Sequence, residues 1–155
     1  MKTLILYATK HGAARQIAQR IAGMMQDAEL CDLKQAGIPS LESYDSVIIG
    51  SSLYAGMIRK ETKAFLRLNG DKLLGKRLGL FVSGLDGSGE KRYFETNFPQ
   101  DILQAAVEKR FLGGIFDPKK AGVMGRLIMR MVTKQAVYTD TISDDAVKRF
   151  AAAFQ

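Results

Sequence analysis

The sequence predicts an α/β fold in which a parallel sheet is covered by helices on both faces. Short apolar runs typical of buried strands alternate along the chain with stretches whose apolar residues recur at helical spacing. The chain has 155 residues, of which 46% are hydrophobic and 25% charged, which suits one globular domain. We therefore expect a single domain over residues 1–155, without a transmembrane helix or a signal peptide.

The strands are recognised by short, nearly continuous apolar runs, as expected when both faces of a sheet are covered. Leu4-Ile5-Leu6, Val47-Ile48-Ile49 and Leu80-Phe81-Val82 are the clearest of these runs. The predicted strands span Thr3–Ala8, Ala28–Leu33, Ser46–Gly50, Arg77–Ser83 and, softened by two glycines, Phe111–Phe116.

The helices are recognised by apolar residues three or four positions apart. The predicted helices span Ala13–Met25, Lys60–Leu68, Ile102–Lys109, Val123–Lys134 and Ala146–Phe154. Ser143 and the acidic pair after it provide a cap and favourable charge for the last helix. Gly37 and Pro39 make a full helix doubtful in the link between the second and third strands.

Ligands of such a sheet bind beyond the carboxyl ends of its strands, and three loops of this chain combine hydroxyl groups with glycine there. Backbone amides at a helix N-terminus favour phosphate, and glycine lets the backbone approach it closely. The first loop consists of Thr9, Lys10, His11, Gly12, Ala13 and Ala14. The second consists of Ser51, Ser52, Leu53, Tyr54, Ala55 and Gly56. The third begins with Ser83, Gly84, Leu85, Asp86 and Gly87 and ends at Gly89.

Several other sites are disfavoured by the sequence. The glycine pattern G-x-G-x-x-G, typical of nicotinamide dinucleotide binding, does not follow the first strand. A phosphate-accepting receiver domain needs acidic residues where Ala8-Thr9 and Gly50-Ser51 stand. His11 is the single histidine and Cys31 the single cysteine, so no metal site is expected. We find no Ser-His-Asp arrangement, and no nucleic-acid-binding motif.

The net charge of +7 is concentrated in one part of the chain: residues 107–135 alone carry +5. In a helix over 123–134, Leu127 and Met131 share an apolar face while Arg126, Arg130 and Lys134 lie on a basic side, next to Met129. One interpretation is contact with an anionic membrane surface or an acidic partner or substrate. The other is a core-packing helix with a solvated basic face.

These residues resemble flavodoxin-like proteins that bind FMN, over nearly the whole chain. The opening segment Leu4–Gly12 looks like the first strand and phosphate loop of that family. More narrowly, the chain is similar to the menaquinone-dependent protoporphyrinogen oxidase (dehydrogenase) group. That similarity lies in Met1–Leu6, in Tyr44–Gly50, and most specifically in Leu127–Arg130 followed by Val137–Asp140.

The resemblance implies a three-layer fold with a five-stranded parallel sheet in the order 2-1-3-4-5 and a noncovalent FMN. The phosphate would lie on Thr9–Ala14, and the isoalloxazine between Ser52–Gly56 and Ser83–Gly89, with Tyr54 stacked on it. Flavin-centred chemistry then leaves no individual catalytic side chain to be named. Ala13 and Ala14 stand where the family usually has a hydroxyl residue. The loop from Ser83 to Tyr93 is shorter than in many members of the oxidase group.

We therefore expect an FMN-dependent oxidoreductase of the protoporphyrinogen IX dehydrogenase type, passing electrons through FMN to a quinone such as menaquinone, in heme biosynthesis. The helix at 123–134 would contact an anionic membrane or the carboxylates of the porphyrinogen. The expected location is cytoplasmic, with peripheral binding to the inner face of the cell membrane. The alternatives are a soluble electron-transfer flavodoxin and an FMN-free binding module of the same fold.

Overall fold

The computed structural model describes residues 1–120, 122–133 and 137–155. The strands are β1 (Thr3–Ala8), β2 (Ala28–Asp32), β3 (Ser46–Tyr54), β4 (Met57–Ile58), β5 (Arg77–Ser83), β6 (Ala106–Phe111), β7 (Ile115–Phe116) and β8 (Thr139–Asp140). The α-helices are α1 (Ala13–Gly23), α2 (Lys60–Leu74), α3 (Glu90–Asn97), α4 (Gln100–Ala105), α5 (Gly122–Thr133) and α6 (Asp144–Ala152). Single 3₁₀ turns occur at η1 (Leu41–Ser43) and η2 (Gly87–Gly89).

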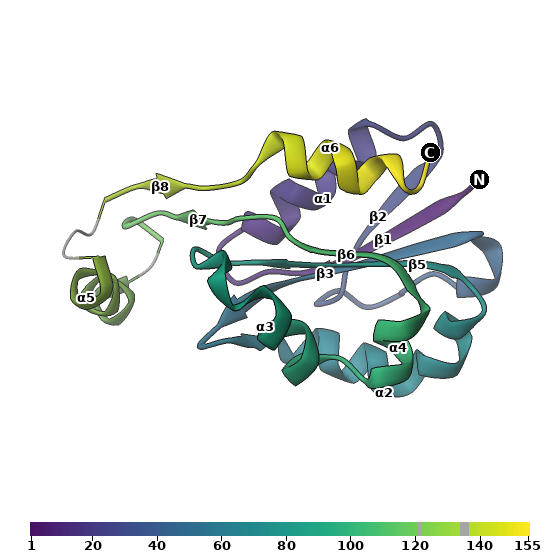
Figure 1. Ribbon diagram of the computed structural model, residues 1–155, viewed down its shortest axis with the longest axis horizontal. Coiled ribbons are helices and arrows are strands. Elements are labelled where there is room, and N and C mark those ends of the chain that lie inside the picture. The colour runs from purple at the N-terminus through teal and green to yellow at the C-terminus, as the bar shows by residue number, and fades with distance from the viewer. Residues whose placement is uncertain (121, 134–136) are drawn as a thin grey trace.

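The molecule has three layers, with the main sheet between two sets of helices (Figure 1). The parallel strands lie in the order β2-β1-β3-β5-β6, and β4 pairs antiparallel with the end of β3. Counting only the parallel strands, this is the predicted order 2-1-3-4-5. Helices α1 and α6 cover one face of the sheet, and α2, α3 and α4 cover the other. The predicted flavodoxin-like architecture is therefore confirmed.

Burial alternates along the central strands because each one contributes side chains to both cores. In β1, Leu4 and Leu6 pack toward α2, while Ile5 packs toward α1 and α6, and all three are fully buried. Gly50 in β3 leaves room for the ring of Phe81 in the neighbouring strand, because a Cβ there would lie 1.9 Å from a Phe81 ring carbon. The continuous apolar runs thus mark strands covered on both faces, as predicted.

Two predicted elements near residue 105 are wrong. The expected helix Ile102–Lys109 stops at Ala105, and the last parallel strand begins at Ala106 rather than at Phe111. Ile102 and Leu103 supply the apolar contacts of α4, and the following segment extends beside β5. The chain then turns at Gly113, whose φ of +86° is a left-handed conformation that glycine adopts without strain. Helix α3 was not predicted, and α2 continues beyond Leu68 to Leu74.

The link between β2 and β3 holds only the short turn η1, as its glycine and proline predict. At the other end of the chain, the predicted cap of the last helix is present. The Ser143 hydroxyl accepts a hydrogen bond from the Ala146 amide at 3.2 Å, and Asp144 and Asp145 occupy the first turn of α6.

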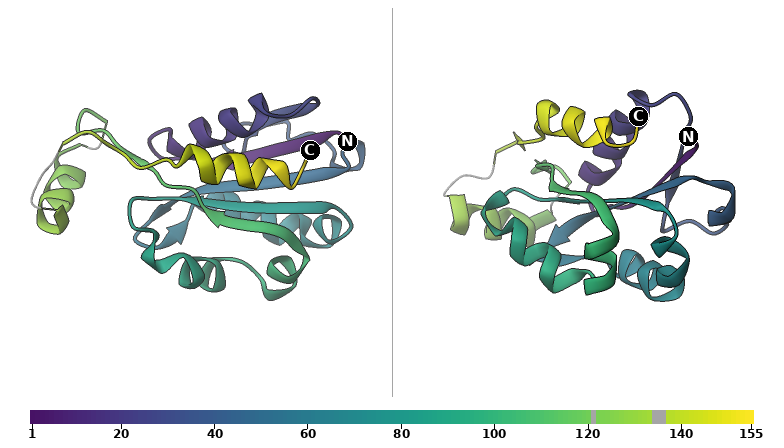
Figure 2. Two further views of the ribbon diagram at one scale, coloured as in Figure 1. Left: turned by 45° about the horizontal axis from the view of Figure 1, so that its top comes forward. Right: turned by 45° about the vertical axis from the view of Figure 1, so that its right-hand side comes forward.

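Between β6 and α6 the chain forms an arm that projects from the three layers. Strands β7 and β8 pair antiparallel as a ribbon, and α5 lies at its far end, away from the main sheet (Figures 1 and 2). Leu127 is 51% exposed and Met131 is 83% exposed. The interpretation of this segment as a core-packing helix is therefore wrong for these two residues. The large apolar side chains of α5 that the structure describes, Val123, Leu127 and Met131, are all exposed.

Within the described residues, none of the helices combines the length and apolar character needed to cross a bilayer.

Candidate functional site

The three predicted loops meet at one edge because β1, β3 and β5 are neighbours in the sheet. Ala8 at the end of β1 pairs with Ser51 in β3, and Ser51 pairs with Val82 in β5. One position further along, Ser52 pairs with Ser83. The parallel register therefore places the starts of all three loops side by side at the carboxyl edge of the sheet.

The first loop closes on itself and leads into α1. Gly12 is the N-cap of α1 with a φ of +99°, and its amide donates a 2.9 Å hydrogen bond to the Thr9 hydroxyl. The first turn of α1 has no acidic residue, and its N-cap makes no side-chain hydrogen bond. Because Ala13 and Ala14 are buried and have no hydroxyl, this helix end offers backbone amides and its positive dipole end to a ligand.

The second predicted loop is a strand and a tight hairpin. Strand β3 continues through Ser51, Ser52 and Leu53 to Tyr54, past the end of β1, because β4 folds back to pair with it. Ala55 and Gly56 form the turn, with φ values of +50° and +76°. Two successive left-handed residues are the pattern of a two-residue hairpin that follows the natural twist of strands. The hairpin raises the Tyr54 side chain out of the sheet edge, where it is 51% exposed.

The third loop is anchored to the base of the arm. The Ser83 hydroxyl and the Gly84 amide both donate to the Gly113 carbonyl oxygen, at 2.8 and 3.1 Å. Leu85 and Gly87 are exposed. The Asp86 carboxylate accepts hydrogen bonds from the Ser88 amide and hydroxyl, which lower the pKa of Asp86.

A hydrogen bond and an aromatic contact join the first loop to the second. The Lys10 amide donates to the Ser52 hydroxyl oxygen at 3.1 Å, and the Lys10 ammonium lies 3.8 Å from the centre of the Tyr54 ring. Two predicted hydroxyls are already engaged by the protein. Ser51 donates to the Ser52 carbonyl, and Ser83 donates to Gly113. Thr9 and Ser52, whose hydroxyl oxygens accept amide protons, keep their own protons for a ligand.

The site is electropositive around His11. Partial burial is the largest cause that lowers the pKa of His11, followed by the positive charges of Lys10 and Arg59 and then of Lys120 and Lys34. The sequence interpretation did not single out Arg59, Lys120 or Lys34 for this site. Arg59 follows the hairpin, which the sequence did not predict, so no local pattern pointed to it. The other two come from the chain after β2 and from the arm.

The predicted contact residues of the arm stand apart from these loops. Arg126 and Arg130 are exposed on α5, where a small hollow is lined by both arginines with Val123 and Leu127. Met129 belongs to α5, but the structure does not describe its side chain. Lys134 lies outside the described residues. Of the predicted basic contact residues, the two that the structure describes, Arg126 and Arg130, therefore lie on an exposed surface.

Comparison with known proteins identifies the family of this chain. The family described as "Flavodoxin domain" matches residues 4–142. The chain belongs to this flavodoxin family. Protoporphyrinogen IX dehydrogenase (quinone) from Escherichia coli strain K12 is 29% identical over 167 residues, covering 90% of this chain and 88% of the relative.

Solved flavodoxins share the fold of this flavodoxin-family chain. Oxidised Flavodoxin 1 from Bacillus cereus superposes with a TM-score of 0.57 at 17% identity, covering 99% of this chain and 97% of that one. The flavodoxin of Fusobacterium nucleatum bound to flavin mononucleotide has a TM-score of 0.53 at 21% identity, covering 70% of this chain and 69% of that one. The predicted cofactor, FMN, is thus borne out at the level of the family.

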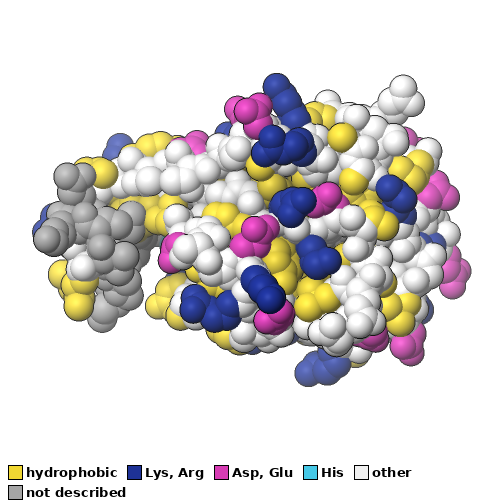
Figure 3. Space-filling view, in the orientation of Figure 1, with side chains coloured by type: hydrophobic (Ala, Val, Ile, Leu, Met, Phe, Trp, Pro, Cys, Tyr) yellow, Lys and Arg dark blue, Asp and Glu magenta, His cyan; other side chains and the backbone are white. Residues whose placement is uncertain are grey.

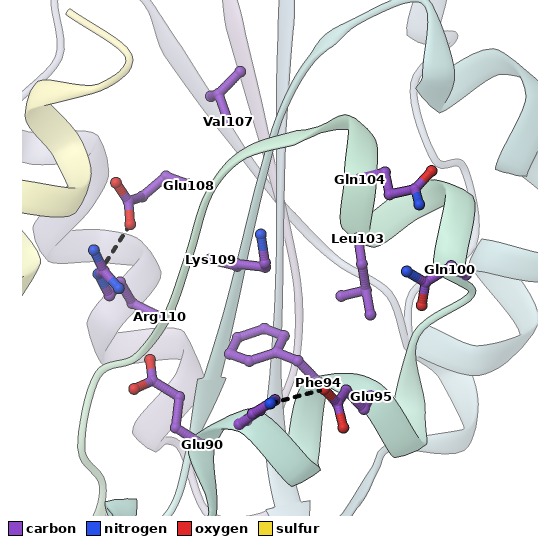
Figure 4. Close-up of a pocket in the computed structure, with 11 residues that line it drawn as sticks. Glu90, Phe94, Glu95, Gln100, Leu103, Gln104, Val107, Glu108, Lys109 and Arg110 are labelled. Carbon is purple, nitrogen blue, oxygen red and sulfur yellow. Dashed lines mark ion pairs between the residues drawn. The ribbon is translucent and has the colours of Figure 1, made fainter.

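A larger hollow of this flavodoxin-family chain is lined by none of the three loops and begins at Glu90, directly after the third loop. It has a volume of about 620 Å³ and lies between α3, α4 and the edge strand β6 (Figure 4). Phe94 and Leu103 line it together with charged residues, and basic and acidic side chains are mixed on this face of the molecule (Figure 3). Two of the lining residues, Glu108 and Arg110, form an ion pair at 2.9 Å. None of the predicted site residues lines this hollow, so size alone does not locate the candidate site.

Among the described residues, no group of three or more His, Cys, Asp or Glu side chains is placed to hold a metal ion.

Proposed function

We propose that this chain is an FMN-dependent oxidoreductase of the protoporphyrinogen IX dehydrogenase type, which takes electrons from a porphyrinogen and delivers them to a quinone. The match to the Escherichia coli enzyme over 90% of the chain supports the reaction class. The observation that favours an enzyme over a simple carrier is the projecting helix α5, which exposes apolar and basic side chains together.

The residues at the carboxyl edge fit the phosphate of FMN. The N-terminus of α1 offers amides that no side chain of the described residues caps, and a helix N-terminus is a natural anion site. Gly12 has no Cβ, and nothing lies within 4 Å of the position that a Cβ would take. A phosphate can therefore approach the backbone of this loop closely. The positive charges around His11 strengthen the attraction. The proposed phosphate position is therefore the turn Thr9–Ala14.

The hairpin and the third loop fit the flavin ring. Tyr54 presents a largely exposed aromatic face on one side, and Leu85 is an exposed apolar side chain on the other. Stacking on an aromatic ring contributes about 0.5–1.5 kcal/mol beyond burial of area. When bound, FMN supplies hydride and electron transfer, and the protein supplies position and electrostatics.

The arm provides a place for a carboxylated substrate or a membrane surface. The third loop and the arm share their base at Gly113, so α5 is carried by the same segment that anchors the flavin site. Arg126 and Arg130 attract carboxylates or anionic lipid headgroups, while Val123, Leu127 and Met131 offer exposed apolar contacts. A quinone dissolves in the bilayer, and a protein that reduces it gains from binding the membrane surface.

The decisive experiment begins with purification. A yellow protein with a flavin absorbance spectrum, and FMN released on denaturation, is the expected result. A colourless protein that takes up no added FMN would instead support the FMN-free binding module. The holoprotein should then oxidise protoporphyrinogen IX anaerobically with menadione as acceptor, measured by porphyrin fluorescence. Free FMN at the same concentration is the control.

A soluble electron-transfer flavodoxin is the second candidate, favoured by the fold shared with Bacillus cereus Flavodoxin 1. A carrier would accept electrons from a reductase at a normal rate but would not turn over protoporphyrinogen. That pair of results would reject the dehydrogenase.

Membrane binding is tested separately with α5. We expect the wild type to sediment with liposomes that contain anionic lipid, and Arg126→Gln/Arg130→Gln to remain in solution. The matched control is Lys148→Gln/Arg149→Gln, which removes two exposed charges from α6. Absence of wild-type binding, or equal loss in both variants, would reject α5 as a membrane contact.

A further inference from the structure

Arg59 is tied through its backbone to the first two loops of the site. It is the N-cap of α2, directly after strand β4, and its amide donates a 2.9 Å hydrogen bond to the Ser51 hydroxyl. The next residue, Ser52, accepts the amide of Lys10 at 3.1 Å. Two hydrogen bonds and one peptide unit therefore connect Arg59 to the loop that opens α1.

The side chain of Arg59 has an unused donor. Its Nε is buried, and it has no hydrogen-bond partner among the described residues. Buried donors are nearly always bonded in folded proteins. Glu61 follows two positions later, but no ion pair joins it to Arg59 within the described chain, and one of its own carboxylate oxygens is buried without a partner. The guanidinium thus keeps both its charge and its donor.

Arg59 is one of four cations whose positive charges act on His11. The neighbours that lower the pKa of His11 are Lys10, Arg59, Lys120 and Lys34, and no carboxylate is among them. Collecting like charges costs free energy in the ligand-free protein. An anion placed among them would remove that repulsion, and the helix end at Gly12 points to the same kind of ligand.

We propose that the Arg59 guanidinium binds the phosphate of FMN from the α2 side of the sheet edge, opposite the amides of α1. This inference rests on the proposed FMN site and assigns the phosphate a charged ligand outside the predicted loops. Ala13 and Ala14 offer no hydroxyl to the phosphate. The planar fork of an arginine is well matched to phosphate oxygens, so Arg59 replaces those missing donors.

The assignment predicts selectivity between two flavins. Riboflavin has the same ring system as FMN but lacks the phosphate, so a residue that acts on the phosphate changes the affinity for FMN alone. A residue that merely supports the hairpin or α2 changes the affinity for both flavins. The ratio of the two dissociation constants therefore separates the proposed role from a structural one.

The experiment titrates apoprotein with FMN and with riboflavin and follows the quenching of flavin fluorescence. We expect Arg59→Met to weaken FMN binding by about 10- to 100-fold, the range for hydrogen bonds to charged groups, with riboflavin affinity changed less than about twofold. Arg59→Lys, which keeps the charge but loses the fork, should fall between Arg59→Met and the wild type. Arg67→Met is the matched control, because it removes an exposed arginine from the same helix.

Four results would overturn the inference. Equal losses for FMN and riboflavin in a folded Arg59→Met protein would show a structural role. Equal losses of FMN affinity in Arg59→Met and Arg67→Met would show a general effect of net charge. Wild-type protein that binds FMN while Arg59→Met leaves its affinity unchanged would reject the role of Arg59 and leave the proposed function standing. Wild-type protein that binds no FMN would reject both.

Discussion

The ammonium group of Lys10 lies 3.8 Å from the centre of the Tyr54 ring and covers one face of it. The contact joins the loop that begins α1 to the hairpin that follows β3. A cation over an aromatic face is attracted by about 0.5–2 kcal/mol. Since Tyr54 is the aromatic proposed to stack on the flavin, the flavin either takes the free face of the ring or displaces Lys10. If the flavin takes the free face, the ammonium of Lys10 lies across the Tyr54 ring from it.

Replacing Lys10 by Met is expected to make the midpoint potential of the bound flavin more negative. A nearby positive charge stabilises the reduced cofactor, because the reduced form carries more negative charge. Removing the Lys10 charge therefore lowers the midpoint potential by on the order of tens of millivolts. The measurement is reduction in the presence of dyes of known potential. Lys63→Met, at an exposed position of α2, is the control. An unchanged or more positive potential in Lys10→Met would show that this charge does not act on the flavin.

Replacing Tyr54 by Leu is expected to weaken the binding of FMN and of riboflavin to the same degree. The lost stacking is about 0.5–1.5 kcal/mol, which corresponds to a roughly 2- to 12-fold rise in either dissociation constant. Fluorescence titration of the apoprotein measures both. Tyr138→Leu removes an exposed tyrosine from the arm and should leave both affinities unchanged. A loss confined to FMN would mean that Tyr54 acts on the phosphate rather than on the ring.

The single histidine reports on the phosphate position. Burial and the neighbouring cations lower the pKa of His11 from 6.5, so NMR titration of the apoprotein should give a value below that of a peptide. The phosphate of FMN should raise the pKa of His11, because a negative charge favours the imidazolium. Riboflavin should not cause this rise. A pKa that FMN leaves unchanged would place the phosphate elsewhere.

The same shift makes stability depend on pH. As the pH falls below about 6.5, the unfolded chain binds a proton at His11 before the folded chain does. The free energy of unfolding of the apoprotein therefore decreases with falling pH in this range. Urea unfolding of the wild type and of His11→Gln between pH 7.5 and 5.5 measures this effect as the difference in slope. Parallel curves would contradict it.

Replacing Gly113 by Ala is expected to destabilise the protein by about 2 kcal/mol or more, because it combines left-handed strain with a backbone clash. The new Cβ would lie 2.2 Å from the Thr141 carbonyl oxygen, at a φ of +86°. Gly70→Ala, in the interior of α2 with nothing within 4 Å, should instead stabilise by about 0.5–1 kcal/mol. Urea unfolding measures both. A Gly113→Ala protein as stable as the wild type would show that the arm's base can move.

The order of strands and helices could be predicted from local patterns of residues, because a strand that is buried on both faces of the sheet needs a continuous run of apolar residues. The run Leu4–Leu6 is apolar without interruption, and Ser143 is a typical N-cap residue at the start of α6. The prediction failed at 102–116, where a short helix passes directly into an edge strand. Residues 106–111 lack a continuous apolar run because an edge strand is only partly covered, so the local pattern there is ambiguous.

The three loops of the candidate site were also predictable, since a parallel sheet brings the carboxyl ends of its strands to one edge. The hairpin at Ala55-Gly56 was not, because it depends on β4 pairing with the end of β3. Nor did the sequence show the charges around His11, which come from segments far apart in the chain. Lys34 follows β2, Arg59 begins α2, and Lys120 belongs to the arm.

The order of residues along the chain was enough to predict the fold class, the sheet edge at which we propose that FMN binds, and the concentration of positive charge in the last third of the chain. The positions of these features relative to one another came from the tertiary structure. It placed α5 on an arm outside the core, where the apolar side chains of Leu127 and Met131 are exposed. It also brought Arg59 beside the first loop. Both outcomes depend on contacts between distant segments, and no local pattern of residues encodes those contacts.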